Sequence, residues 1–179
     1  MKLLSFFNEG KLRLGLKTEK GIVDVEAMGE KYSLKVPETM EMAIQQGASG
    51  QEILRKLQGL VECEPEGQKL EYLSESSLKF APVLLAPEKI LCIGLNYKSH
   101  SEECNIAIPE SPVVFGKFNN ALAAHGQKID LPAGAVKFDY EAELVIIMGK
   151  EAACIRKEEA GEYIFGYTVG NDLSARDLQ

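Results

Sequence analysis

Asp139-Tyr140-Glu141-Ala142-Glu143 runs directly into Leu144-Val145-Ile146-Ile147-Met148, so an acidic segment leads into an apolar one. The apolar part is typical of a β-strand, on which side chains alternate between two faces. We therefore expect Asp139, Glu141 and Glu143 to share one face. Three carboxylates on one face repel each other, and a bound Mg²⁺, Mn²⁺ or Ca²⁺ would remove that repulsion. A solvated acidic strand face without an ion is the alternative interpretation.

A second polar segment, Gly170 to Asp177, follows the apolar strand predicted over 164–169. Asp172 in this segment is a candidate third ligand, supplied by a neighbouring strand. The alternative is an ordinary polar strand end, in which Arg176 and Asp177 form a local ion pair.

A third segment joins a predicted strand to a predicted short helix. Residues 90–95 form a nearly unbroken apolar run, as expected of a strand buried on both faces. Asn96 suits a helix N-cap, and a helix after it would place His100 and Glu103 on one face. A carboxylate that orients an imidazole makes a competent general base. The alternative is an exposed helical turn with an ordinary pair of residues three apart.

The first 75 residues are predicted to form a small α/β domain. Residues 3–7 and 12–16 are expected to form a β-hairpin around Asn8-Glu9-Gly10, since residues 12–16 alternate as a half-buried strand does. Ile22, Val23 and Val25 are expected to extend the sheet. Two short helices follow. The first is expected to start at Pro37 and end at Gly47, and the second to carry a capping box of Ser49 and Glu52.

The remaining residues, 76–179, are predicted to form a β-rich second domain. The polar stretch 62–75, with Pro65 and Gly67, is the expected linker. Strands are expected near residues 78–80, 113–115, 129–131, 144–148 and 164–169, and one helical turn over 158–162. The expected fold class is therefore α+β.

Composition restricts the partners. The chain has 20 basic and 27 acidic residues, a formal charge of −7, which argues against binding to nucleic acid or to anionic membranes. The four cysteines lack the spacing of a zinc site and fit a reduced, cytoplasmic compartment.

Taken together, the motifs resemble those of the fumarylacetoacetate hydrolase family. Four motifs of that family occur here in order and at fitting spacing between residues 88 and 179. They are Asn96-Tyr97 with His100 and Glu103, Pro112 with Phe115 and Lys117, Asp139-Tyr140-Glu141-Ala142-Glu143-Leu144, and Gly166-Tyr167 with Asn171-Asp172, Ala175-Arg176-Asp177 and Gln179.

The resemblance implies roles for individual residues. Glu141, Glu143 and Asp172 would hold one divalent cation, with Mg²⁺ first and Mn²⁺ or Ca²⁺ as alternatives. His100 and Glu103 would be the catalytic dyad that activates water or moves a proton, and Lys117 would line the pocket. Arg176 and Gln179 would support the site rather than touch substrate.

The resemblance also implies a function and a mixed β-roll in the second domain. Family substrates are small 2-oxo acids, so acylpyruvate-type C–C hydrolysis is expected. Decarboxylation or tautomerisation of keto diacids such as oxaloacetate or 2-hydroxyhepta-2,4-diene-1,7-dioate is also open. Family members continue beyond the last motif, so the β-roll is expected to be incomplete at the C-terminus. Association through exposed sheet edges, or a homodimer, is then expected. The alternative is a truncated, non-catalytic binding or scaffold protein.

Overall fold

A four-stranded antiparallel sheet organises the N-terminal part of the protein. The computed structural model describes residues 1–65, 70–103 and 105–179. The sheet has the order β3-β2-β1-β4 and contains β1 (Lys2–Asn8), β2 (Lys11–Thr18), β3 (Gly21–Asp24) and β4 (Lys79–Phe80). The predicted hairpin is confirmed. Its two-residue turn, Glu9-Gly10, has positive φ at both positions, which matches the twist of the flanking strands.

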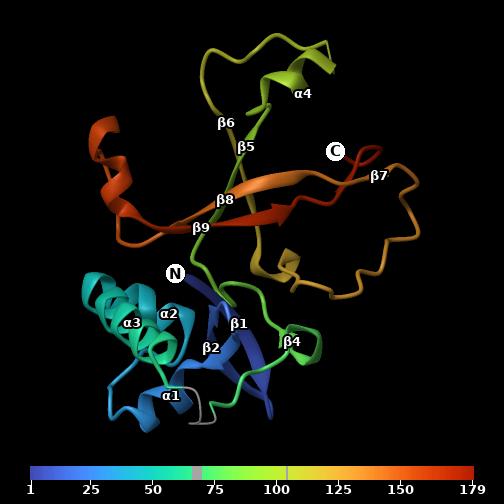
Figure 1. Ribbon diagram of the computed structural model, residues 1–179. Helices are drawn as coiled ribbons and strands as arrows, with labels where there is room; N and C mark the ends of the chain where they lie inside the picture. The colour runs from blue at the N-terminus through green and yellow to red at the C-terminus, as the bar shows by residue number, and fades with distance from the viewer. Residues whose placement is uncertain (66–69, 104) are drawn as a thin grey trace.

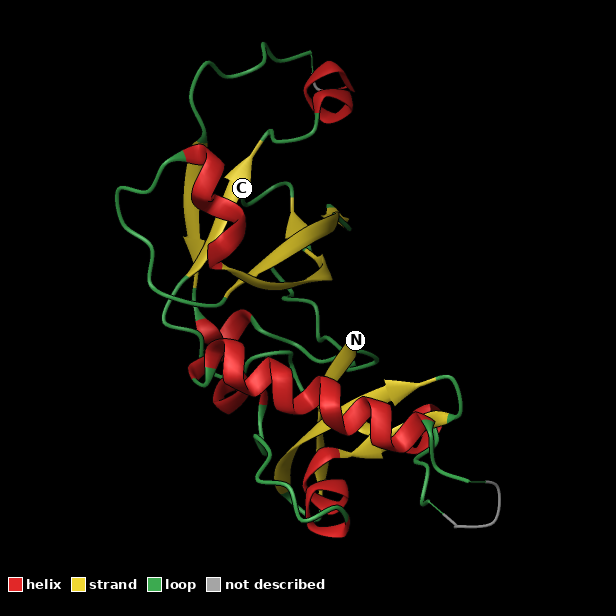
Figure 2. Ribbon diagram, turned by 60° about the vertical axis from the view of Figure 1, so that its left-hand side comes forward, coloured by secondary structure: helices red, strands yellow, loops and turns green. Residues whose placement is uncertain are grey.

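Three helices cover this sheet: α1 (Val25–Lys31), α2 (Met40–Gln45) and α3 (Gly47–Glu62). Figure 2 shows the longest, α3, running across the strands. The prediction that Val25 extends the sheet is wrong, because the Asp24 carboxylate accepts hydrogen bonds from the backbone N–H groups of Glu26 and Ala27 and starts α1 there.

The predicted ends of the next two helices are also corrected. Thr39 caps α2, so this helix starts three residues after Pro37. The capping box of Ser49 and Glu52 does not form, because α3 already begins at Gly47 and the Ser49 hydroxyl donates to the Gln46 carbonyl instead.

The hydrophobic core lies between this sheet and its helices. With the single exception of Ala135, the buried apolar side chains of the described residues all come from residues 6–81. They include Leu14, Leu16, Leu54 and Leu57, each at most 1% exposed. The N-terminal part therefore carries the burial that stabilises this chain.

In the second part, the strands of the described residues form three separate two-stranded antiparallel sheets. β5 (Ile90–Gly94) pairs with β6 (Val113–Lys117), and β8 (Ala142–Met148) pairs with β9 (Ile164–Asn171). The short strands β7 (Phe138–Asp139) and β10 (Ser174–Ala175) form the third pair. The helical segments are α4 (Lys98–Glu103) and the 3-10 turns Glu75–Ser77, Asn119–Ala121 and Lys157–Tyr163, the last at the predicted helical turn. Figure 1 shows the β5–β6 ribbon crossing the β8–β9 ribbon.

Two strand predictions for this part are corrected. β5 is not buried on both faces, because Leu91 is 66% exposed. In the described chain β5 pairs only with β6, and no further layer covers the face that carries Leu91. Residues 129–131 form a loop. Among the described residues they have no pairing strand, and Pro132 after them lacks a backbone donor.

The predicted domain division is not sharp in the structure. β4 lies beyond residue 75 but pairs with β1, so the chain returns to the first sheet before it enters the second part. Gly67 of the expected linker and Cys104 lie outside the described residues. The division into 1–75 and 76–179 stays a prediction. None of the described helices has the length and apolar character needed to cross a membrane.

Candidate metal centre

The β8–β9 pair brings two acidic segments together at one end. Ala142 is opposite Asn171, so Glu141 lies just before β8 and Asp172 just after β9. The Asp172 backbone N–H donates to the Glu141 carbonyl at 2.8 Å, and the Glu141 N–H donates to Asn171 Oδ1 at 3.0 Å. These two bonds fix the backbone on both sides of the cluster.

Three carboxylates converge at this end. One oxygen from each of Glu141, Glu143 and Asp172 lies within 4.8 Å of the others. Asp139 is not part of this group, so the expected face of Asp139, Glu141 and Glu143 forms only in part. The strand is interrupted at Tyr140 and Glu141, and Asp139 belongs to β7, which pairs with β10.

Lys117, from β6, reaches the same cluster. Its Nζ lies 2.5 Å from Asp172 Oδ1. The Asp172 side chain is only 10% exposed, and Oδ1 receives no hydrogen bond of ordinary geometry from the described residues. The interaction with Asp172 raises the pKa of Lys117. An ammonium group therefore already faces a largely buried carboxylate of the cluster.

The surroundings of Glu143 show how strongly the three carboxylates interact. Burial raises the pKa of Glu143, and the negative charges of Asp172 and Glu141 raise it further. Cys92, from β5, lies in the same field: burial raises the pKa of its thiol, and the charge of Asp172 adds to the shift. A divalent cation at the cluster would relieve this repulsion.

Arg176 contacts the cluster from the other side. Its Nη1 lies 2.7 Å from Glu141 Oε1, while Nε and Nη2 donate to Asp139 Oδ2 at 3.1 and 3.0 Å. The ion pair between Arg176 and Asp177, considered as an alternative, is not found among the described residues, because Asp177 accepts hydrogen bonds from the backbone N–H groups of Val136 and Lys137.

Helix α4 carries His100 and Glu103 one turn apart, with His100 half-buried and Glu103 exposed. The helix starts at Lys98, two residues beyond Asn96, and the Tyr97 carbonyl accepts the N–H of His100 at 3.0 Å. The Tyr97 hydroxyl accepts a hydrogen bond from the Leu144 N–H at 3.2 Å. This bond ties the start of α4 to the strand that carries Glu143.

His100 also acts on the acidic segment electrostatically. The hydrogen bond from Arg176 is the main cause that lowers the pKa of Asp139, and the charge of His100 acts in the same direction. The roles expected of His100, Glu103 and Lys117 stay predictions.

The donor set suits a hard divalent cation. Carboxylate oxygens are the ligands that Mg²⁺, Mn²⁺ and Ca²⁺ prefer, and Asp172 Oδ1 is a buried oxygen that already faces the positive charge of the Lys117 ammonium. Glu141, Glu143 and Asp172 therefore fit such an ion.

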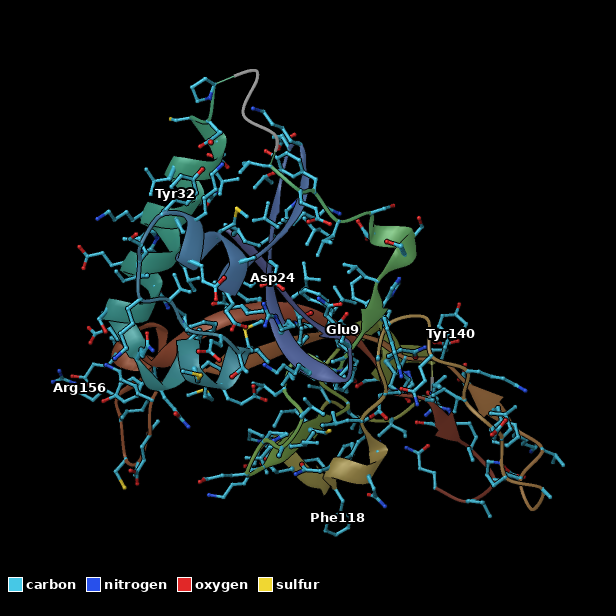
Figure 3. The ribbon with its side chains drawn as sticks, turned by 90° about the horizontal axis from the view of Figure 1, so that it is seen from below. Glu9, Asp24, Tyr32, Phe118, Tyr140 and Arg156 are labelled. Atoms are coloured by element: carbon cyan, nitrogen blue, oxygen red, sulfur yellow. The ribbon has the colours of Figure 1, made fainter. Side chains whose placement is uncertain are left out.

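Sequence patterns did not show what several residues do at the site. Asn171 and the Tyr97 hydroxyl act through contacts to residues 30 and 47 positions away, which periodicity does not reveal. Cys92 was expected only as a buried thiol, and its place beside the carboxylates depends on the same tertiary packing. Tyr140, beside the site, and Phe118 are 75% and 81% exposed and extend away from the ribbon (Figure 3).

Comparison with protein families supports the resemblance seen in the sequence. The family model described as fumarylacetoacetate (FAA) hydrolase C-terminal matches residues 89–179, slightly more than half of the chain. The chain is 32% identical over 169 residues to oxaloacetate tautomerase fahd2, mitochondrial, of Xenopus laevis, which covers 93% of this chain and 49% of that protein. It is 50% identical over 95 residues to the fumarylacetoacetate hydrolase domain-containing protein 2 homolog of Dictyostelium discoideum, covering 53% of this chain and 31% of the relative. The chain thus spans at most about half the length of these curated relatives.

Solved structures show the same fold over the whole chain. Fumarylacetoacetate hydrolase from Exiguobacterium antarcticum matches 100% of this chain and 58% of its own, with a TM-score of 0.70 and 25% identity. Maleylpyruvate hydrolase from Sphingobium sp. SYK-6, solved in complex with manganese (II) ion and pyruvate, matches 98% of this chain and 60% of its own, with a TM-score of 0.70 and 22% identity. With the family model matched over residues 89–179, these findings show that the chain belongs to the fumarylacetoacetate hydrolase family.

Proposed function

We propose that the chain carries the cation site of a divalent-metal-dependent enzyme that acts on small 2-oxo acids. The observation that carries this proposal is the convergence of Glu141, Glu143 and Asp172, whose oxygens lie within 4.8 Å of one another. The names of the similar proteins support the substrate class, since they include an oxaloacetate tautomerase and a maleylpyruvate hydrolase.

The proposed cofactor is Mg²⁺, with Mn²⁺ or Ca²⁺ as alternatives, held by the three carboxylates. When bound, such an ion supplies Lewis-acid stabilisation of negative charge on a 2-oxo group. Lys117 presents a second positive charge beside Asp172 and suits the carboxylate of a 2-oxo acid.

The reaction we place first is tautomerisation of oxaloacetate. This reaction moves one proton between the carbon beside the keto group and the keto oxygen. His100 is the proposed base for the carbon-bound proton, and Glu103 would orient its imidazole. The Tyr97–Leu144 hydrogen bond supports this role, because it holds the start of α4 against β8.

The same site is compatible with two further reactions. If His100 activates water instead, attack on a distal carbonyl of an acylpyruvate breaks a C–C bond. If a carboxylate leaves as CO₂, the result is decarboxylation. The cation ligands are common to all three reactions, so the choice depends on residues around the substrate.

We also propose a cytoplasmic location and association with a second copy. Cys63, Cys92 and Cys154 are free thiols, which fits a reducing compartment, although the Xenopus relative is named mitochondrial. Neither nucleic acid nor a membrane is a proposed partner, because the chain carries a net charge of −7.

Two measurements test the proposal. Calorimetric titration with Mg²⁺ or Mn²⁺ should give saturable heat for the wild type and negligible heat for Glu143→Ala. Enol–keto conversion of oxaloacetate, followed by ultraviolet absorbance, should depend on the added cation and fall at least about 100-fold in His100→Ala. Acetylpyruvate assayed in parallel separates hydrolysis from tautomerisation. Equal, negligible heats in both proteins would refute the metal site. Metal binding without turnover of either substrate would instead support a non-catalytic binding protein.

A further inference from the structure

Among the described residues, the contacts that hold Glu141 reach only one of its two carboxylate oxygens. Within the described part of the chain, Arg176 Nη1 lies 2.7 Å from Oε1 and the Ser174 hydroxyl donates to the same atom at 3.4 Å. A carboxylate fixed through one oxygen keeps its other oxygen available in a defined direction. The guanidinium of Arg176 therefore orients this carboxylate within the cluster.

Arg176 is in turn held by Asp139. Nε and Nη2 both donate to Asp139 Oδ2, and the other oxygen, Oδ1, accepts the Tyr140 N–H at 2.9 Å. The backbones that carry the two side chains are paired, since Asp139 is opposite Ser174 and the Arg176 N–H donates to the Lys137 carbonyl. All three guanidinium nitrogens are thus engaged, and the planar group is held in one orientation.

The charges around the cluster balance for a divalent ion. Four carboxylates, those of Asp139, Glu141, Glu143 and Asp172, face the two cations Lys117 and Arg176. Two negative charges remain. Without Asp139, only Glu141 among these carboxylates would offset the positive charge of Arg176, and that charge would act more strongly on the bound ion.

We propose that Asp139 and Arg176 are a positioning pair for the cation site: Asp139 fixes the guanidinium that orients Glu141 and offsets its charge. This inference rests on the proposed cation site and extends it to a residue outside the cluster. Partners that orient metal ligands alter metal affinity although they do not touch the ion.

Mn²⁺ affinity of the purified 179-residue chain, measured from the electron paramagnetic resonance signal of free Mn²⁺, tests the pair. Asp139→Asn removes the negative charge that offsets Arg176. Arg176→Lys keeps the positive charge but loses the planar guanidinium that contacts Asp139 and Glu141 at once. Each should raise the dissociation constant roughly 10-fold or more. Asp130→Asn is the matched control. This substitution removes the same charge on the same side of the molecule, from a side chain that is 92% exposed. It should stay within about twofold of wild type.

The metal-free melting temperature and a conservative variant separate positioning from a structural role. All three variants should melt within a few degrees of wild type, and Asp139→Glu should recover most of the affinity. If Asp139→Asn does not fold, the Mn²⁺ dissociation constant of Arg176→Lys alone tests the positioning pair. Dissociation constants within twofold of wild type for both Asp139→Asn and Arg176→Lys, with Glu143→Ala unable to bind, would overturn the pair and leave the cation site standing. No Mn²⁺ binding by the wild type would overturn both.

Discussion

Individual residues around the cluster compete for its oxygens. Lys117 Nζ lies 2.5 Å from Asp172 Oδ1, so an ammonium group occupies the surroundings of an oxygen that a cation would use. A divalent ion and the ammonium group repel each other at this distance. We therefore expect Lys117 to lower the affinity of the cluster for a cation.

Replacing Lys117 should consequently have opposite effects on metal binding and on turnover. Lys117→Gln is expected to bind Mn²⁺ roughly 10-fold more tightly, because one positive charge beside the cluster is removed. Oxaloacetate turnover should fall in the same variant. Calorimetry and the absorbance assay check the two effects, and Lys150→Gln, a lysine that contacts the Tyr163 ring instead, serves as control. Weaker metal binding by Lys117→Gln would contradict this account.

A second residue prediction concerns Tyr32, in the N-terminal part. Burial, together with the hydrogen bond that its hydroxyl donates to Glu64, raises the pKa of Tyr32 to about 12 from its ordinary value of 10.0. The folded state then holds this proton more tightly than the unfolded state does. The corresponding stability is complete below about pH 10 and is lost as the pH rises towards about 12.

Urea unfolding at several pH values checks this expectation. The free energy of unfolding of the wild type should fall more steeply between about pH 10 and 12 than that of Tyr32→Phe, which has no hydroxyl to titrate. Tyr163→Phe is a control for general loss of tyrosine. Parallel curves for wild type and Tyr32→Phe would contradict the shift.

At the scale of elements, the sequence correctly predicted those elements that depend on interactions between residues near each other in the chain. The β1–β2 hairpin follows from the alternation of Leu12, Leu14 and Leu16, and the structure confirms it. The segment at Val25 could not be assigned from alternation, because a side-chain cap from Asp24 turned an apparent strand into α1. The loop at 129–131 is apolar enough for a strand, but strand formation needs a partner, which is a tertiary property.

The acidic residues of the candidate site also divide into three whose convergence the sequence predicted and one, Asp139, whose position it did not. Glu141, Glu143 and Asp172 were predictable, because each sits at the end of a strongly apolar strand and the pairing of two strands places them together. Asp139 looked equivalent to them by its spacing. Its separation depends on the interruption at Tyr140 and on the guanidinium of Arg176, neither of which a period of two residues contains.

The elements also differ in what they contribute to stability. Leu54 of α3 is fully buried in the core, whereas Leu144 of β8 is 61% exposed. Leu54→Ala should lower the free energy of unfolding by about 2–5 kcal/mol, and Leu144→Ala by less than about 1 kcal/mol. Urea denaturation followed by circular dichroism measures both. Equal losses would contradict the assignment of the core to the N-terminal part.

On the scale of the whole molecule, an apolar surface is left open by the second part. The outer side of the β8–β9 pair, which we name the hairpin face, is 47–78% exposed at its apolar side chains: Leu144, Ile146, Met148, Tyr167 and Val169. A contiguous exposed apolar surface of this kind favours association. This agrees with the proposed contact between copies.

The hairpin face can be tested without disturbing the core. The wild-type chain should exceed its monomer mass of 19.7 kDa in light scattering at tens of micromolar, and Leu144→Ser with Val169→Ser should shift it towards the monomer. Phe118→Ser is the control, since Phe118 is 81% exposed but comes from outside β8 and β9. A monomeric wild type, or an equal shift in the control, would contradict this assignment.

The central claim is that carboxylates from two paired strands meet at one cation. Anomalous diffraction from crystals of the chain grown with Mn²⁺ tests it most directly. We expect one strong anomalous peak in contact with an oxygen from each of Glu141, Glu143 and Asp172, with the Lys117 ammonium moved away from Asp172. Manganese bound elsewhere, or no peak between these three side chains at saturating Mn²⁺, would contradict the account.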